Sequence, residues 1–258
     1  AIYLYFPQAV PQVMTIDPDH CLYIQEERCG ACAKICEAGA IDFEQTAQDV
    51  DVAVGAVVVA AGYDFFDPRD LTQFGYKQSP NVVTALEYER LISASGPTGG
   101  ELRRISDGEP VRRIGFIQCV GSRDVRHQIF CSSVCCMHAS KQAVLAAEHD
   151  PGVESMVFYT DFRASGKGFR QYVARAEREY GVRYVRGRVA RITADEKENP
   201  VIHYEDARTS RPARETVDMA VLATSLIPRP ETAKLAELLG IEIDEYGFVR
   251  TEPFAPVD

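Results

Sequence analysis

The eight cysteines of this 258-residue chain form two short groups, and this grouping constrains the fold more than any other feature. One group is Cys21, Cys29, Cys32 and Cys36, and the other is Cys119, Cys131, Cys135 and Cys136. Four thiols are the number that one four-iron cluster or one structural zinc ion takes. Each group therefore predicts a small metal centre, and no cysteine is left over.

The first group has the spacing C-x2-C-x3-C from Cys29 to Cys36, with Cys21 upstream. The segment CGACAKICEAGAIDF resembles the second half of a bacterial ferredoxin, in which small residues let backbone N–H groups approach the cluster sulfurs. It departs from that pattern at Glu37, where a ferredoxin usually has proline, and in the displaced first cysteine. We expect all four thiols to bind one [4Fe–4S] cluster. A zinc knuckle, unliganded thiols and a Cys36 that serves another cluster remain alternatives.

The second group follows an expected strand over residues 113–120, which ends beside Cys119. The other three cysteines stand at the start of an expected helix over 132–149, with Cys131 and Cys135 on one face. An adjacent cysteine pair is unusual for structural zinc. The pair in this group therefore favours a second [4Fe–4S] cluster. A redox disulfide and a set of buried thiols are the alternatives.

A dinucleotide-binding turn would carry G-x-G-x-x-G after this strand. The chain has CVGSRDVRHQIFCSSVCC there instead. The sequence therefore predicts that a cluster-binding loop replaces the phosphate-binding turn.

Alternating strand and helix patterns predict an open α/β sheet. The apolar run VAVGAVVVAAGY over 52–63 is typical of a buried parallel strand. Residues 93–110, rich in Gly, Pro and Ser, resemble an interdomain linker. Further helices are expected over 81–94, 168–180 and 231–240, and further strands over 153–160, 182–185, 188–192, 201–204 and 216–223.

Composition limits the class of protein. The chain has 46% apolar and 26% charged residues and a formal net charge of -10, which argues against binding to nucleic acid or anionic membranes. Its apolar runs are far shorter than the roughly 20 residues of a membrane-spanning helix. No secretory signal opens the chain, so we expect a cytoplasmic protein. Its start at Ala1 suggests a fragment of a longer polypeptide.

Several longer segments resemble the family of heterodisulfide reductase A subunits. The most specific are FCSSVCCMHASKQA and NVVTALEYERLISASGPTGGE, and the resemblance covers nearly the whole chain. It implies a thioredoxin-reductase-like body that binds FAD, with a small inserted ferredoxin-like module. By this resemblance the chain divides into a partial ferredoxin-like module (1–50), part of the FAD domain with a linker (51–110), an NAD(P)-domain-like unit with the second cluster (111–225), and a return segment (226–258).

The resemblance also implies cofactors, roles and partners. It places two [4Fe–4S] clusters on the two cysteine groups, Gly62 at an FAD-contacting turn, and Lys141 and Glu89 near the flavin ring. The implied function is electron transfer, with flavin-based bifurcation in some complexes, beside other reductase subunits and a hydrogenase- or formate-dehydrogenase-type donor. The alternative functions are an NADPH-dependent disulfide oxidoreductase and a zinc-stabilised interaction module.

Overall fold

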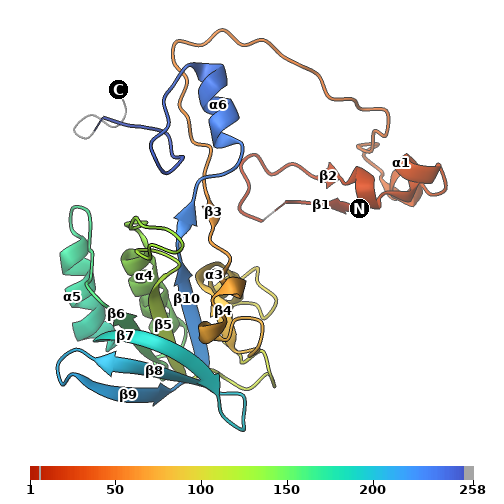
Figure 1. Ribbon diagram of the computed structural model, residues 1–258. Helices are drawn as coiled ribbons and strands as arrows, with labels where there is room; N and C mark the ends of the chain where they lie inside the picture. Colours follow the sequence, from red (N-terminus) through yellow and green to blue (C-terminus); the bar gives the residue numbers. More distant parts are fainter. Residues whose placement is uncertain (6, 253–258) are drawn as a thin grey trace. The chain divides into compact units, whose positions relative to one another are not determined.

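The computed structural model describes residues 1–5 and 7–252, and its chain divides into two compact units, residues 1–59 and 60–258. The elements of the first unit are short, and Figure 1 labels β1, β2 and α1 among them. They are β1 (Ile2–Tyr3), β2 (Thr15–Ile16), the 3-10 turn η1 (Pro18–His20), α1 (Leu22–Glu26) and α2 (Ala31–Ile35). The strands β1 and β2 pair antiparallel. Among the described residues of this unit only Cys21 and Gly30 are buried, so it has no apolar core of its own.

The second unit is built on a seven-stranded sheet in the order β4-β10-β5-β6-β7-β8-β9. Its first five strands run parallel and the last two pairings are antiparallel. The strands are β4 (Val82–Thr84), β5 (Arg113–Val120), β6 (Glu154–Tyr159), β7 (Arg183–Ala194), β8 (Pro200–Asp206), β9 (Arg211–Thr216) and β10 (Met219–Thr224). The predicted α/β class is confirmed.

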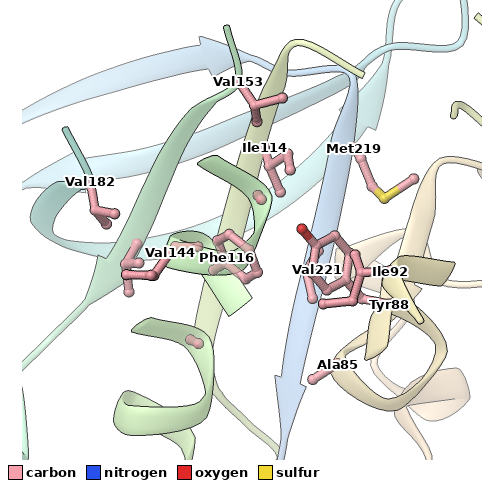
Figure 2. Packing of buried hydrophobic residues seen from close by; sticks show 14 of the residues in the cluster. Ala85, Tyr88, Ile92, Ile114, Phe116, Val144, Val153, Val182, Met219 and Val221 are labelled. Carbon is pink, nitrogen blue, oxygen red and sulfur yellow. The ribbon is translucent and has the colours of Figure 1, made fainter. Parts of the chain in front are cut away.

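Two apolar clusters lie on opposite sides of the parallel strands. The first joins residues of β5, β6 and β10 to the helices α3 (Ala85–Ile92), α4 (Cys135–His149) and α5 (Phe169–Tyr180). Figure 2 shows Tyr88 of α3 and Phe116 of β5 in this cluster, and their rings meet edge to face at 5.4 Å between centroids. The second cluster packs the other side of the strands against β8 and the segment around Leu71.

Helix α3 begins with a capping box, which explains its boundary. The Thr84 hydroxyl accepts from the backbone N–H of Glu87, and the Glu87 carboxylate accepts from the backbone N–H of Thr84. The predicted helix over 81–94 is thus split: its first residues form β4, the edge strand beside β10.

The strand β7 replaces the two strands predicted over 182–185 and 188–192. Its first half pairs parallel with β6, and its second half, from Gly187, pairs antiparallel with β8. A Cβ on Gly187 would come within 2.5 Å of the Glu205 carbonyl oxygen, so this crossing requires glycine. Gly187 is therefore the point at which one continuous strand changes partner.

The prediction of a buried strand over 52–63 is wrong. No strand is assigned within these residues, and the side chains of Val52, Val54, Val57 and Val58 are exposed. An apolar run forms a strand only where neighbouring strands accept its backbone hydrogen bonds. None of the described strands pairs with this run, and pairing begins only at β3 (Asp64–Phe65) with β11 (Leu226–Ile227).

Three other segments complete the second unit. Residues 93–110, which resemble a linker, form turns that pack on the unit: the buried Asn81 amide donates to the Ser106 hydroxyl at 2.9 Å and to the Glu198 carbonyl at 2.8 Å. Two 3-10 turns, η2 (Pro68–Asp70) and η3 (Thr72–Phe74), precede β4, and α6 (Thr232–Leu239) follows β11. After α6, Ile243 and Val249 form one isolated antiparallel bridge.

Candidate functional site at the carboxyl end of β5

The second cysteine group lies where β5 ends, and a bulge there sets the position of Cys119. Ile117 and Val120 pair with Leu222 and Thr224 of β10, so β5 has one extra residue at this point. Cys119 takes a left-handed conformation with φ of 61°. This costs a non-glycine residue about 1–2 kcal/mol, which the surrounding structure must offset.

The loop between β5 and α4 returns the chain to the point from which it left. Residues 121–130 form a small closed loop, in which the Arg123 N–H donates to the Phe130 carbonyl at 3.0 Å and the Gln128 N–H donates to the Gly121 carbonyl at 3.1 Å. Cys131, the residue after this loop, is thereby brought back toward the end of β5.

The serine after Cys131 ties the loop to the end of β10. The Ser132 hydroxyl accepts from the Leu226 N–H at 2.9 Å and lies 3.1 Å from the Ser225 hydroxyl. The Cys135 thiol donates to the Thr224 carbonyl at 3.8 Å. The loop and the start of α4 are therefore fixed over the carboxyl ends of β5 and β10, the edge at which ligands bind in open α/β sheets.

The predicted common helix face for Cys131 and Cys135 is wrong. Helix α4 begins at Cys135, and Cys131 stands in the loop before it, separated by Ser133 with φ of 61°. Within the second group only Cys135 and Cys136 are helical. They lie in the first turn of α4, where the positive end of the helix dipole favours thiolates.

The four thiols of the second group are close enough to affect one another. Burial raises the pKa of Cys135 to about 12, and the thiols of Cys119, Cys136 and Cys131 contribute to this increase. Burial likewise raises the pKa of Cys119 and of Cys136, again with contributions from other cysteines of the group. Without a compensating positive charge these thiols stay protonated at neutral pH.

Backbone donors also point at sulfur in this group. The Arg163 N–H donates to the Cys136 sulfur and the Ser133 N–H donates to the Cys131 sulfur, each at 3.4 Å. Mutually crowded thiols, N–H donors and a helix start fit a cluster that replaces four protons with metal charge. Across residues 1–5 and 7–252, however, no three His, Cys, Asp or Glu side chains gather tightly enough to hold a single metal ion.

The first cysteine group surrounds the two short helices of the first unit. Cys21 precedes α1, Cys32 lies within α2, and Cys36 ends it, with its N–H donating to the Cys32 carbonyl at 3.0 Å. The Ala40 N–H donates to the Cys36 sulfur at 3.4 Å. Cys21 is buried and Cys29 is exposed. All four thiols of this group are free.

Lys141 and Glu89 meet in the structure although 52 residues separate them. Lys141 on α4 forms an ion pair with Glu89 on α3, and the Gln142 amide donates to the other oxygen of Glu89 at 2.9 Å. Burial disfavours the charged carboxylate, but the hydrogen bonds from Lys141 and Gln142 outweigh it and lower the pKa of Glu89. Both charges are half-exposed, so they are available to a further group.

Two further features bear on the site. Gly62 has φ of 75° and no neighbour within 4 Å of a built Cβ, so it is a left-handed turn with open space beside it. A cavity of about 780 Å³ opens beside Cys119, between the ends of β5 and β6 and the middle of β7, and Arg123, Arg126 and Arg188 line it. Sequence reasoning did not identify these arginines, because none of them lies in a recognisable motif.

Comparison with known proteins identifies the family. No protein-family model matches the chain. It is 44% identical over 252 residues to the iron-sulfur A subunit of the CoB–CoM heterodisulfide reductase of Methanocaldococcus jannaschii, covering 97% of this chain and 38% of that protein. It is 42% identical over 252 residues, with the same coverage, to the A subunit of the H2/formate:CoB–CoM heterodisulfide,ferredoxin reductase of Methanococcus maripaludis.

A third relative is the A subunit of the ferredoxin:CoB–CoM heterodisulfide reductase of Methanosarcina mazei, 40% identical over 93% of this chain and 30% of that protein. The chain thus spans between 30% and 38% of the length of these three relatives. Among solved structures, a Thermoplasma acidophilum thioredoxin reductase has a TM-score of 0.41 at 13% identity, over 74% of this chain and 50% of that one. That similarity is too weak to support an inference. The sequence identities are sufficient, and the chain belongs to the family of heterodisulfide reductase A subunits.

Proposed function

We propose that this chain is part of an iron–sulfur flavoprotein that transfers electrons within a heterodisulfide-reductase-type complex. The observation that carries the proposal is the gathering of Cys119, Cys131, Cys135 and Cys136 at the carboxyl end of β5. In this position a dinucleotide-binding fold has its glycine-rich turn, and the chain has thiols instead.

We assign one [4Fe–4S] cluster to each cysteine group. The raised pKa values of Cys119, Cys135 and Cys136 favour this assignment for the second group, because the positive charge of bound iron would stabilise three thiolates that burial otherwise keeps protonated. In the first unit, where only Cys21 and Gly30 are buried among described residues, a bound cluster would supply the core that the polypeptide lacks.

We further propose that Lys141, Glu89 and Gly62 contribute to an FAD site. A flavin accepts two electrons together and releases them singly, which suits transfer to clusters. The half-exposed ammonium of Lys141, oriented by Glu89, would stabilise negative charge on a reduced ring. Because the chain contains no G-x-G-x-x-G fingerprint, these residues would form only part of that site.

For the whole protein we propose the other reductase subunits as partners and a hydrogenase- or formate-dehydrogenase-type electron donor. The name of the Methanococcus maripaludis relative supports this proposal for the electron donor, because it contains H2 and formate. The same name contains a heterodisulfide and ferredoxin, which supports the two electron acceptors that bifurcation requires. We propose a cytoplasmic location. None of the described helices has the length and apolarity needed to cross a membrane.

Metal analysis of cysteine variants tests the cluster assignment. Two cubanes require about eight irons and eight sulfides in this chain. We expect Cys135→Ala and Cys29→Ala each to remove about four irons, with Val125→Ala, an exposed residue in the loop between β5 and α4, as a control that retains all of them. Anaerobic purification, iron, sulfide and zinc analysis and the visible spectrum give the result. Zinc without iron, a yellow protein without iron, or loss of all iron from either single change would contradict the proposal.

A further inference from the structure

Asp161 joins two arginines, and each arginine approaches a different cysteine of the second group. Asp161 follows β6, and its two carboxylate oxygens form ion pairs with Arg123 and with Arg163, the second at 3.2 Å from the Arg163 Nε. Arg123 belongs to the closed loop after β5. The ion pairs therefore connect the two loops that leave the carboxyl ends of β5 and β6.

On the Arg163 side the contact to sulfur is made by the backbone. The Arg163 N–H donates to the Cys136 sulfur at 3.4 Å. The Arg163 side chain is held by Asp161, which helps to fix the direction of that N–H group. An N–H donor aimed at a cluster sulfur stabilises negative charge on it.

On the Arg123 side the contact is made by the guanidinium. Arg123 and Cys119 line the same cavity. The Arg123 backbone is held with φ of 58° by its hydrogen bond to Phe130. The side chain is anchored at its other end by Asp161. Both ends of Arg123 are therefore fixed beside Cys119.

We propose that Arg123, held by Asp161, is a positioning residue that sets the reduction potential of the cluster bound by the second cysteine group. Arg123 and Arg163 carry two positive charges and Asp161 carries one negative charge, so the three side chains together have one net positive charge. Because reduction adds one negative charge to the cluster, this positive charge stabilises the reduced form and raises the potential. The inference rests on the proposed [4Fe–4S] assignment to these four cysteines.

The test is an anaerobic redox titration of the full-length protein, followed by electron paramagnetic resonance. We expect Arg123→Gln to shift the midpoint potential of this cluster to a lower value. Arg123→Lys keeps the charge, so it should retain most of the wild-type potential. Arg126→Gln is the matched control. Arg126 lies in the same loop and lines the same cavity, but it forms its ion pair with Asp124, at 2.9 Å, rather than with Asp161.

A second variant distinguishes an effect of charge on the midpoint potential from an effect of disrupted local structure. Asp161→Asn keeps an oxygen that can accept from Arg123 but removes the negative charge, so we expect the midpoint to shift upward, opposite to Arg123→Gln. Disruption of local structure would shift both variants in the same direction and would overturn the inference. So would an Arg123→Gln shift no larger than that of Arg126→Gln. Failure of the cluster assignment has a separate signature: Cys135→Ala would then remove no iron.

Discussion

Replacing Gly121 with alanine probes how tightly the site-bearing loop packs. Gly121 directly follows β5 and has φ of 74°, and a Cβ there would overlap Cδ1 of the half-buried Phe66 ring. A left-handed alanine costs about 1–2 kcal/mol. Overpacking against the ring adds about 1–3 kcal/mol. We therefore expect Gly121→Ala to lower the free energy of unfolding by about 2–5 kcal/mol.

Gly181→Ala is the control that separates these two contributions. Gly181 ends α5 with φ of 67°, and a Cβ there would meet nothing within 4 Å, so only the conformational cost applies. The excess of about 1–3 kcal/mol for Gly121→Ala corresponds to a melting temperature lower by roughly 2–12 °C than that of Gly181→Ala. Far-ultraviolet circular dichroism at one scan rate measures the difference.

A double-mutant cycle identifies the clashing partner. In a Phe66→Ala background the ring is absent, so Gly121→Ala should then cost no more than Gly181→Ala does. Equal melting temperatures for Gly121→Ala and Gly181→Ala in the wild-type background would refute the proposed clash. An unchanged excess cost without the Phe66 ring would show that another contact is responsible.

Two further predictions concern buried and surface polar groups. Asn81→Ala should destabilise the second unit by about 2–4 kcal/mol, because the backbone N–H groups of Ile105 and Ser106 both lose the Asn81 oxygen as acceptor. A melting temperature close to that of the wild type would contradict this. Asp195 organises the turn between β7 and β8, and its hydrogen bonds with Asn199, followed by those from backbone N–H groups, lower its pKa. Its stabilisation is thus complete above the ordinary carboxyl pKa of about 4 and is lost as pH falls through the lowered folded-state value. The stability difference between wild type and Asp195→Ala, measured by thermal melting from pH 7 to pH 3, should shrink at the acid end, and a constant difference would exclude a role for the charge.

The α/β class and most of its elements could be predicted from local patterns. The strand over 113–120 has the predicted bounds, and α5 and α6 lie within the expected helices. Amphipathic spacing and helix-ending glycines are local properties, so the sequence reports them directly. The run 52–63 shows the limit of this reasoning, since β-propensity does not state whether a partner strand is present.

The two cysteine groups were evident from spacing alone, but the backbone geometry that brings the second group together was not. Residues 119 and 135 come together because a bulge in β5 and a closed loop bring the chain back on itself, and neither feature has a sequence signature here. The same holds for Arg123 and Asp161, which lie 38 residues apart on separate loops.

The sequence by itself determined the chemistry that is available: eight thiols in two sets, an alternating α/β pattern, and a loop without the glycines of a dinucleotide turn. Only the tertiary structure decided which charges face the sulfurs. The parallel sheet places the carboxyl ends of β5, β6 and β10 at one edge, so loops from distant parts of the sequence meet there. Local residue preferences decide where each strand ends, whereas the packing of the strands decides which loops become neighbours.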